Sequence, residues 1–196
     1  MSLNMQGKAR LGVAVALLLV AGVGNAAISI STTLSGTEPT TTPRVFRDGV
    51  ASTCGGKAFP GTNASTVNYD IHTVYNNGPS RCVTVSVDVG TCGTNMFATA
   101  YTTPVNVAAL ATNYLGDQGS SVTQPFSFVA PGYSAIDILV TSVTGVITTP
   151  CTYSISSAEL DSAASQAIPT LSGWGLAILS GLLGIAAFGW RRFRRI

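Results

Sequence analysis

Apolar and polar residues alternate in several short segments in the middle of the chain. The two clearest segments are Val67–Asn76 and Cys82–Val89. A period of two with one apolar face is typical of a half-buried β-strand. In the second segment we assign Val83, Val85, Val87 and Val89 to the core face. The residues at 76–79, Asn-Asn-Gly-Pro, predict a turn between the two segments.

Further strands are expected on both sides of this pair. They are predicted at Arg44–Phe46, Met96–Thr102, Gln124–Val129, Ser134–Val143 and Cys151–Ser157. Residues 28–42 are predicted to be a leader with an edge strand, and 113–119 an ordered loop. Seven or eight short strands at this spacing favour an all-β fold. We expect an antiparallel β-sandwich of jelly-roll type, because face-to-face sheets bury one apolar side of each strand.

Both ends of the chain differ from this middle. Lys8 and Arg10 precede an apolar run over 11–24, and small residues follow up to Ala26. This order is typical of a secretory signal peptide, which we assign to residues 1–26 with cleavage after Ala26. Cleavage after Ala27 and an uncleaved anchor are the alternatives. Near the other end, residues 171–190 are uncharged, and a helix of this length spans about 30 Å, the thickness of a bilayer core.

The uncharged stretch predicts a transmembrane helix, and a basic tail over 191–196 follows it. Its four arginines, Arg191, Arg192, Arg194 and Arg195, resist translocation, so we expect a cytoplasmic C-terminus. Between the two ends we assign an ectodomain to 27–157, with its core at 44–157, and a linker to 158–167. These positions would make the protein exported and membrane-anchored.

The C-terminal order of motif, apolar stretch and arginines resembles the IPTL-CTERM sorting signal, a relative of the PEP-CTERM signals of Gram-negative bacteria. The resemblance covers 168–196 and rests on Ile168, Pro169, Thr170, Leu171, Trp174 and Gly175. It implies that an exosortase, a membrane protease, recognises these residues as a substrate site. An ordinary single-span anchor is the alternative.

The charge of the exported part excludes one class of partner. Residues 27–168 hold four basic and all eight acidic residues, which gives a net charge of −4. Nucleic-acid binding requires a basic surface, so we do not expect it. The single histidine and the lack of a Cys-x-x-Cys pair also argue against a zinc site.

Four cysteines lie in the ectodomain: Cys54, Cys82, Cys92 and Cys151. An even number in an exported chain predicts two disulfides. Of the three pairings that exist, we favour Cys82–Cys92 across a hairpin and Cys54–Cys151 between an early and a late strand.

The middle of the chain resembles a β-sandwich module of large bacterial surface proteins, distantly similar to pre-peptidase C-terminal and proprotein-convertase P-type domains. The runs that carry this resemblance are RVFRDGVASTCGG (44–56), YDIHTVYNNGPSRCVTVSV (69–87), TNYLGDQGSS (112–121) and FSFVAPG (126–132). The resemblance implies an accessory domain without an activity of its own.

Candidate chemistry begins in Val67–Asn76. With Tyr69, Ile71 and Tyr75 assigned to the core face, Asp70 and His72 share the opposite, solvent-facing side. They would serve as an acid–base pair if a serine nucleophile were present, but no G-x-S-x-G motif occurs. We therefore expect no catalytic residues and no enzyme.

Calcium binding and sugar binding are two possible functions for a domain without catalytic residues. Calcium would use oxygen ligands from Asp48, Asp88, Asp117 and Asp137, and Asp117 is the best single candidate because it lies in a glycine-flanked loop. Turn caps are the simpler interpretation of these residues, so we expect no metal and no cofactor. A sugar-stacking platform would use Tyr69, Tyr75, Tyr101, Tyr114 and Tyr133, although most are expected to be core residues.

These observations predict an exported cell-surface or extracellular-matrix protein that is not an enzyme. Its partners would be the Sec machinery, signal peptidase, an exosortase-like protease, the membrane and an exopolysaccharide. The alternatives are a carbohydrate- or calcium-binding module, a hydrolase, and a periplasmic protein that stays anchored.

Overall fold

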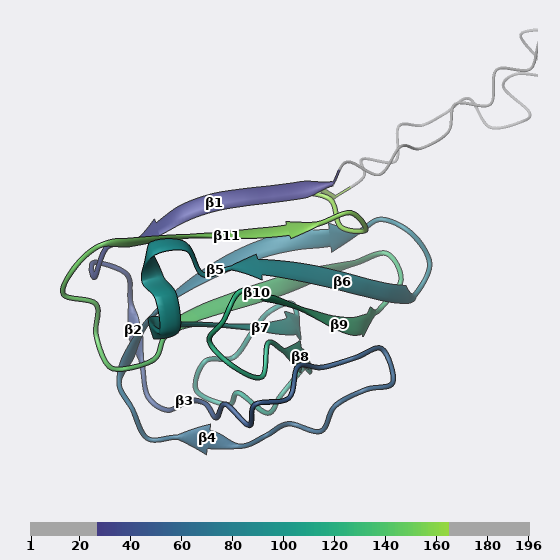
Figure 1. Ribbon diagram of the computed structural model, residues 1–196. Coiled ribbons are helices and arrows are strands. Elements are labelled where there is room, and N and C mark those ends of the chain that lie inside the picture. The colour runs from purple at the N-terminus through teal and green to yellow at the C-terminus, as the bar shows by residue number, and fades with distance from the viewer. Residues whose placement is uncertain (1–26, 165–196) are drawn as a thin grey trace, which may run out of the picture.

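The computed structural model describes residues 27–164, which form a sandwich of β-sheets (Figure 1). The strands are β1 (Ile28–Leu34), β2 (Thr40–Thr41), β3 (Arg44–Val45), β4 (Thr62–Asn63), β5 (Val67–Asn76), β6 (Arg81–Asp88), β7 (Met96–Thr102), β8 (Tyr114–Asp117), β9 (Gln124–Ala130), β10 (Ser134–Ser142) and β11 (Cys151–Ser157). A 3₁₀ helix, η1 (Gly90–Asn95), lies between β6 and β7.

Two antiparallel sheets make up the sandwich. One has the order β1-β11-β6-β9, and the other has the order β2-β5-β10-β7-β8. Apart from the short β2, the eight strands of these sheets have jelly-roll connectivity. The all-β, antiparallel prediction is therefore confirmed. The expected ordered loop at 113–119 contains a strand, β8, at the edge of the second sheet.

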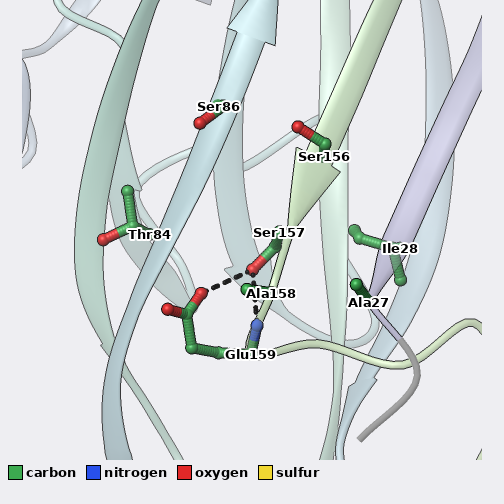
Figure 2. A pocket seen from close by; sticks show the side chains of 8 residues that line it. All are labelled: Ala27, Ile28, Thr84, Ser86, Ser156, Ser157, Ala158 and Glu159. Carbon is green, nitrogen blue, oxygen red and sulfur yellow. Dashed lines mark hydrogen bonds between the residues drawn. The ribbon is translucent and has the colours of Figure 1, made fainter.

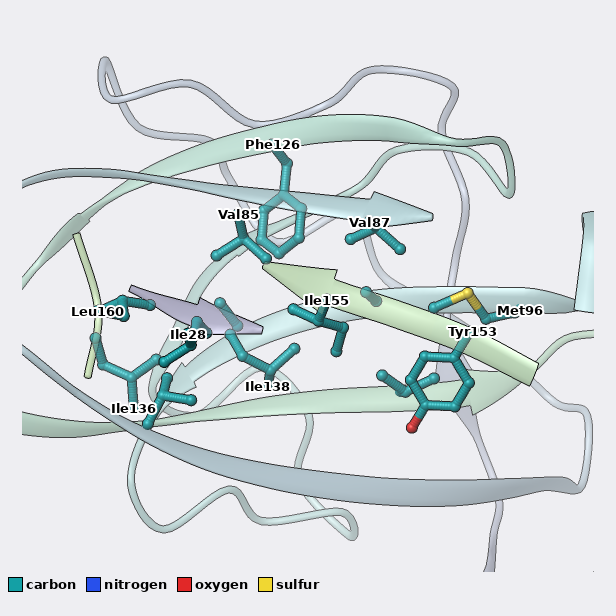
Figure 3. Close-up of a cluster of buried hydrophobic side chains, with 14 of the residues drawn as sticks. Ile28, Val85, Val87, Met96, Phe126, Ile136, Ile138, Tyr153, Ile155 and Leu160 are labelled. Atoms are coloured by element: carbon teal, nitrogen blue, oxygen red, sulfur yellow. The ribbon is translucent and has the colours of Figure 1, made fainter. Parts of the chain in front are cut away.

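The main core lies between the two sheets (Figure 3). The expected core face of β6 is confirmed for Val83, Val85 and Val87, which are all buried. Val89 lies just past the end of the strand and is only partly buried. Phe126 of β9 and Ile155 of β11 extend this layer, and β7 and β10 supply the facing side chains. Each fully buried aliphatic or aromatic side chain stabilises the fold by about 1.5–3 kcal/mol.

A second apolar cluster covers the outer face of the five-stranded sheet. It consists of Val45, Phe97, Tyr101, Leu110, Leu139 and Val143. The segment 44–63 carries β3 and β4 and is called the cover segment below; it packs here together with 103–113. The β10–β7 part of the five-stranded sheet is thus buried on both faces, whereas β5 is partly exposed. For this reason β7 and β10 are nearly continuously buried instead of alternating.

The cover segment also closes one side of the sandwich, between the edges of β8 and β9. The N–H of Ser52 donates to the carbonyl of Asp117 at 2.9 Å, and the N–H of Ser127 donates to the carbonyl of Ser52 at 2.9 Å. This close approach requires glycine at position 116, because a Cβ there would lie 2.3 Å from Ser52 Oγ. Both sheet edges on this side are therefore hydrogen-bonded rather than open.

The assignment of the two faces of β5 was wrong. Ile71, expected in the core, is 37% exposed, whereas Asn68 and Asn76 are buried beside Val74. The amide of Asn68 is paired, because it donates to the carbonyl of Glu38 at 2.8 Å and accepts from the N–H of Ile147 at 2.7 Å. A buried amide is tolerated when it is hydrogen-bonded. The polar side of β5 consequently faces the other sheet.

The favoured cysteine pairing was also wrong. Both disulfides exist among the described residues, but they join Cys54 to Cys82 and Cys92 to Cys151. Cys82 lies at the start of β6 and Cys92 lies beyond its end, in η1. A strand rises about 3.3 Å per residue, so β6 separates these two residues by far more than the roughly 7 Å that a disulfide can span. The chain also does not form a hairpin here, because β6 and β7 belong to different sheets.

The signal peptide assigned to 1–26 and the helix assigned to 171–190 lie outside the described residues. Within residues 27–164, no helix is long and apolar enough to cross a membrane. At the start of the expected linker, Leu160 is fully buried in the main core, and Asp161 forms a bridge with Tyr75. The folded part therefore extends past residue 157.

Candidate functional site

Most residues predicted to carry function lie at the two ends of the chain. Ala26, the sorting-motif residues from Ile168 to Gly175 and the terminal arginines are outside the described residues. The structure does place the polar side chains of the ectodomain that were considered for catalysis, metal binding or sugar binding. Some of them form two separate clusters, one around His72 and one around Asp117, and the others lie apart from both.

The first cluster joins β5 to β11 and contains Asp70, His72 and Tyr153. His72 Nε2 and the Tyr153 hydroxyl are 2.7 Å apart, and that hydroxyl donates to Asp70 Oδ2 at 3.2 Å. His72 Nε2 also lies 3.4 Å from Asp70 Oδ2. The side chain of His72 is 14% exposed, so the expectation that it points to solvent was wrong. Tyr153 itself lies in the main core (Figure 3).

The pKa shifts of His72 and Tyr153 are those of buried structural side chains rather than of a catalytic base and nucleophile. Burial lowers the pKa of His72, and the nearby Asp70 only partly offsets this effect. Burial raises the pKa of Tyr153, and the charge of Asp70 and the hydrogen bond to it raise it further. The hydroxyl that meets His72 is thus a phenol that resists ionisation, not a serine. The arrangement lacks the activated nucleophile that hydrolysis by a triad requires.

The second cluster surrounds Asp117 on β8. Its side chain is fully buried and its Oδ1 accepts from Lys57 Nζ at 2.8 Å and from the N–H of Gly119 at 2.6 Å. The Tyr114 hydroxyl donates to Oδ2. Lys57, which is 10% exposed, also donates to Asp48 Oδ1 at 2.7 Å and to the carbonyl of Val50. Lys57 therefore links the cover segment to the edge of the five-stranded sheet.

This cluster has clear electrostatic consequences. Burial alone would raise the pKa of Asp48, but the hydrogen bond from Lys57, the N–H of Val50 and the charge of Lys57 together lower it. Burial raises the pKa of Tyr114, and its hydrogen bond to Asp117 adds to the effect. The ammonium of Lys57 occupies the position at which Asp117 would otherwise offer an oxygen to calcium. Asp117 is thus an ion-pair partner in this structure.

The other aspartates considered for calcium act as hydrogen-bond acceptors in separate places. Asp137 accepts from Thr73 Oγ1 and from the N–H of Val105. Asp88 accepts from the N–H of Gly90 and from Thr123 Oγ1. In the part of the chain that the structure describes, no three His, Cys, Asp or Glu residues are grouped in a way that would hold a metal ion.

The tyrosines do not assemble into a sugar-binding platform. Tyr101 is fully buried, and its ring meets that of Tyr114 edge to face at 6.0 Å inside the second apolar cluster. Tyr69 also packs against this cluster. Tyr133, which is 76% exposed, lies in the turn between β9 and β10. Tyr133 and Tyr75 line a separate hollow of about 340 Å³. The five tyrosines are therefore divided between the second apolar cluster and this hollow, and they do not form one platform.

A shallow hollow of about 380 Å³ lies where the chain enters and leaves the four-stranded sheet (Figure 2). It is lined by Ala27, Ile28, Thr84, Ser86, Ser156, Ser157, Ala158 and Glu159. Ser157 Oγ contacts Glu159 Oε2 at 3.0 Å, as Figure 2 shows. Its lining contains no aromatic side chain on which a sugar ring would stack.

The sequence interpretation missed Lys57 and Tyr153, and it considered Tyr114 for sugar binding rather than as the hydrogen-bond partner of Asp117. Lys57 had a visible signal, because it is the only lysine after residue 8. Residues 27–168 hold more acidic than basic residues, so a lone lysine among them is a natural candidate for an ion pair. Tyr153 had no such signal, since its partners His72 and Asp70 lie on β5, a strand of the other sheet.

Comparison with known proteins identifies the C-terminal part of the chain only. Residues 166–195 match the family model of the IPTL-CTERM motif. This match supports a sorting tag on an exported protein. No curated protein and no solved structure matches the chain. The resemblance of the ectodomain to pre-peptidase C-terminal and P-type domains therefore stays a prediction.

Proposed function

We propose that this chain is an exported cell-surface or extracellular-matrix protein whose folded part is a non-enzymatic, disulfide-bonded β-sandwich. The match of residues 166–195 to the IPTL-CTERM motif carries this proposal. The two disulfides support it independently, because disulfides form and persist in oxidising compartments outside the cytoplasm.

Several finer steps belong to the same proposal. Signal peptidase removes residues 1–26 after Sec-dependent export, and the uncharged stretch 171–190 holds the chain in the membrane with the arginines inside. An exosortase-type protease then cuts at the motif that includes Pro169 and releases the ectodomain to the surface. The non-enzymatic assignment is supported by the chemistry of the His72 cluster, whose hydroxyl partner is the high-pKa phenol of Tyr153.

The intact mass and the terminal sequences of the protein test this proposal. Native protein is taken separately from the cell envelope and from the medium. We expect a chain that begins at Ala27 and ends near the motif. A chain that still ends at Ile196 in both fractions would contradict processing and would leave the anchored periplasmic protein as the better interpretation.

A pair of variants tests whether the exosortase-type protease recognises the motif. Pro169→Ala changes the Ile-Pro-Thr-Leu run at 168–171, whereas Gln166→Ala changes the first residue of the matched region, just before that run. We expect Pro169→Ala to retain the tag and Gln166→Ala to be processed like the natural chain. Equal processing of the two variants would show that the motif does not direct the cut.

A further inference from the structure

We propose that Lys57 and Asp117 form an intramolecular amide bond, which fastens the cover segment covalently to strand β8. The bond would be a self-formed modification of the folded domain. It is independent of the sorting proposal, because it needs neither the tag nor any other protein.

The positions of the two side chains favour condensation. Lys57 Nζ lies 2.8 Å from Asp117 Oδ1, so the nitrogen is adjacent to the carboxyl carbon that it would attack. The side chains are 10% and 0% exposed, and the fold holds both in place. Well-oriented groups within one molecule react as though at concentrations of about 10⁵–10⁸ M. Water stabilises the separated ammonium and carboxylate, and the burial of both side chains limits its access to them.

The surrounding groups can move the required protons. The ammonium of Lys57 can pass one proton to Asp117 Oδ1, to which it already donates, which gives a neutral amine and a neutral carboxylic acid. Asp48 Oδ1 lies 2.7 Å from Nζ, so it can accept a second proton from the nitrogen as the amine attacks Cγ of Asp117, and return it to the departing oxygen. The two oxygens of the tetrahedral intermediate already have donors, because the N–H of Gly119 contacts Oδ1 and the Tyr114 hydroxyl contacts Oδ2.

The reaction balances without any added reagent. A C–N bond forms between Lys57 Nζ and Asp117 Cγ, and one C–O bond of the carboxyl group breaks. Of the three ammonium protons, one stays on the amide nitrogen and two leave with the oxygen as water. One positive and one negative charge are consumed together, and no atom is oxidised or reduced.

The product fits its surroundings better than the ions do. The cluster now places one ammonium and two carboxylates in a mostly buried position, which is costly even when they are paired. In the product, the amide N–H retains an acceptor in the Val50 carbonyl or in Asp48. The amide oxygen retains a donor in Gly119 or Tyr114. The new bond would complement the Cys54–Cys82 disulfide, which ties the same segment to β6 of the other sheet.

Peptide mass spectrometry of the exported full-length chain tests the bond. The protein is denatured, reduced, alkylated and digested with trypsin and chymotrypsin. We expect no tryptic cut after Lys57 and a joined peptide that contains both Lys57 and Asp117. Its mass should fall short of the sum of the two linear peptides by one water. Linear peptides cut at Lys57, from protein whose two disulfides had formed, would overturn the proposal.

Three variants separate the bond from an ordinary ion pair. Lys57→Arg keeps the positive charge but cannot condense in this way, so trypsin should cut it at position 57 with no joined peptide. Asp117→Asn should give a joined peptide of the same mass as the natural chain, because ammonia leaves instead of water. Asp48→Asn should slow the reaction. A joined peptide in Lys57→Arg would show that the link involves other residues.

Discussion

At the scale of single residues, the buried polar side chains hold the structure together where apolar packing alone would not. Asn68 links β5 to the loop that contains Ile147, and Lys57 links the cover segment to β8. His72 and Tyr153 join one sheet to the other. Removing one partner of such a pair leaves a buried group without a hydrogen bond, which costs about 1–3 kcal/mol.

His72 should make the stability of the folded part depend on pH. Burial lowers its pKa in the folded protein below the ordinary value of about 6.5. The unfolded chain therefore takes up a proton first as the pH falls, and the free energy of unfolding should decrease from about pH 7 toward pH 5. Urea unfolding at pH 7.5 and pH 5.5 measures this change.

The control for this prediction is His72→Gln. His72 is the only histidine in the chain, so no other side chain with an ordinary pKa titrates in this range. Carboxylates with a lowered pKa, such as Asp48, lose their stabilising effect only at more acidic pH. The variant should show a much smaller change between the two pH values. An equal change in both proteins would contradict the assignment.

At the scale of the elements, the connections between strands decide which distant parts of the chain meet. The strand β6 carries one disulfide near its start, and η1 carries the other just beyond its end. The first disulfide ties the cover segment to the four-stranded sheet. The second ties η1 to the start of β11, so both fasten irregular segments onto strands.

Disulfide mapping and paired cysteine variants should reproduce this arrangement. Digestion without reduction should yield peptides that join Cys54 to Cys82 and Cys92 to Cys151. The loops span 28 and 59 residues. The chain-entropy relation then predicts losses of about 3.5 and about 4 kcal/mol when each pair is changed to serine. Denaturant unfolding of the two double variants measures these losses, and a peptide joining Cys82 to Cys92 would contradict the structure.

At the scale of the whole molecule, both ends of the folded part leave from one end of the sandwich. Ile28 at the start of β1 pairs with Ser157 at the end of β11, as Figure 1 shows for the two strands. The segments before and after the domain are therefore attached side by side. A membrane-anchored form would hold this end nearest to the bilayer and present the opposite end outward.

The tag should be dispensable for folding. An exported chain that stops after Ala164 keeps Leu160 in the core and the bridge of Asp161 to Tyr75. We expect it to form both disulfides and to unfold cooperatively. A chain that stops after Ser157 loses the buried Leu160 side chain, and we expect it to be less stable by about 2–5 kcal/mol. Circular dichroism during denaturation compares the two, and equal stability would place the end of the fold at Ser157.

The sequence by itself determined the all-β class, most strand positions and the sorting motif. These features depend on local patterns: the alternation in Cys82–Val89, the turn residues at 76–79 and the order of residues from Ile168 onward. Each can be recognised without knowing which strands are neighbours.

Only the tertiary structure decided the buried face of β5, the cysteine pairing and the Lys57–Asp117 contact. A period of two separates the two faces of a strand, but it does not say which face meets the other sheet. In β5 the face with the hydrogen-bonded Asn68 is buried, and the face with Ile71 is exposed. The cysteine and lysine partners depend on how the cover segment crosses from one sheet to the other. Long-range pairing of this kind is set by strand order and by hydrogen bonding in the folded protein, which no local pattern records.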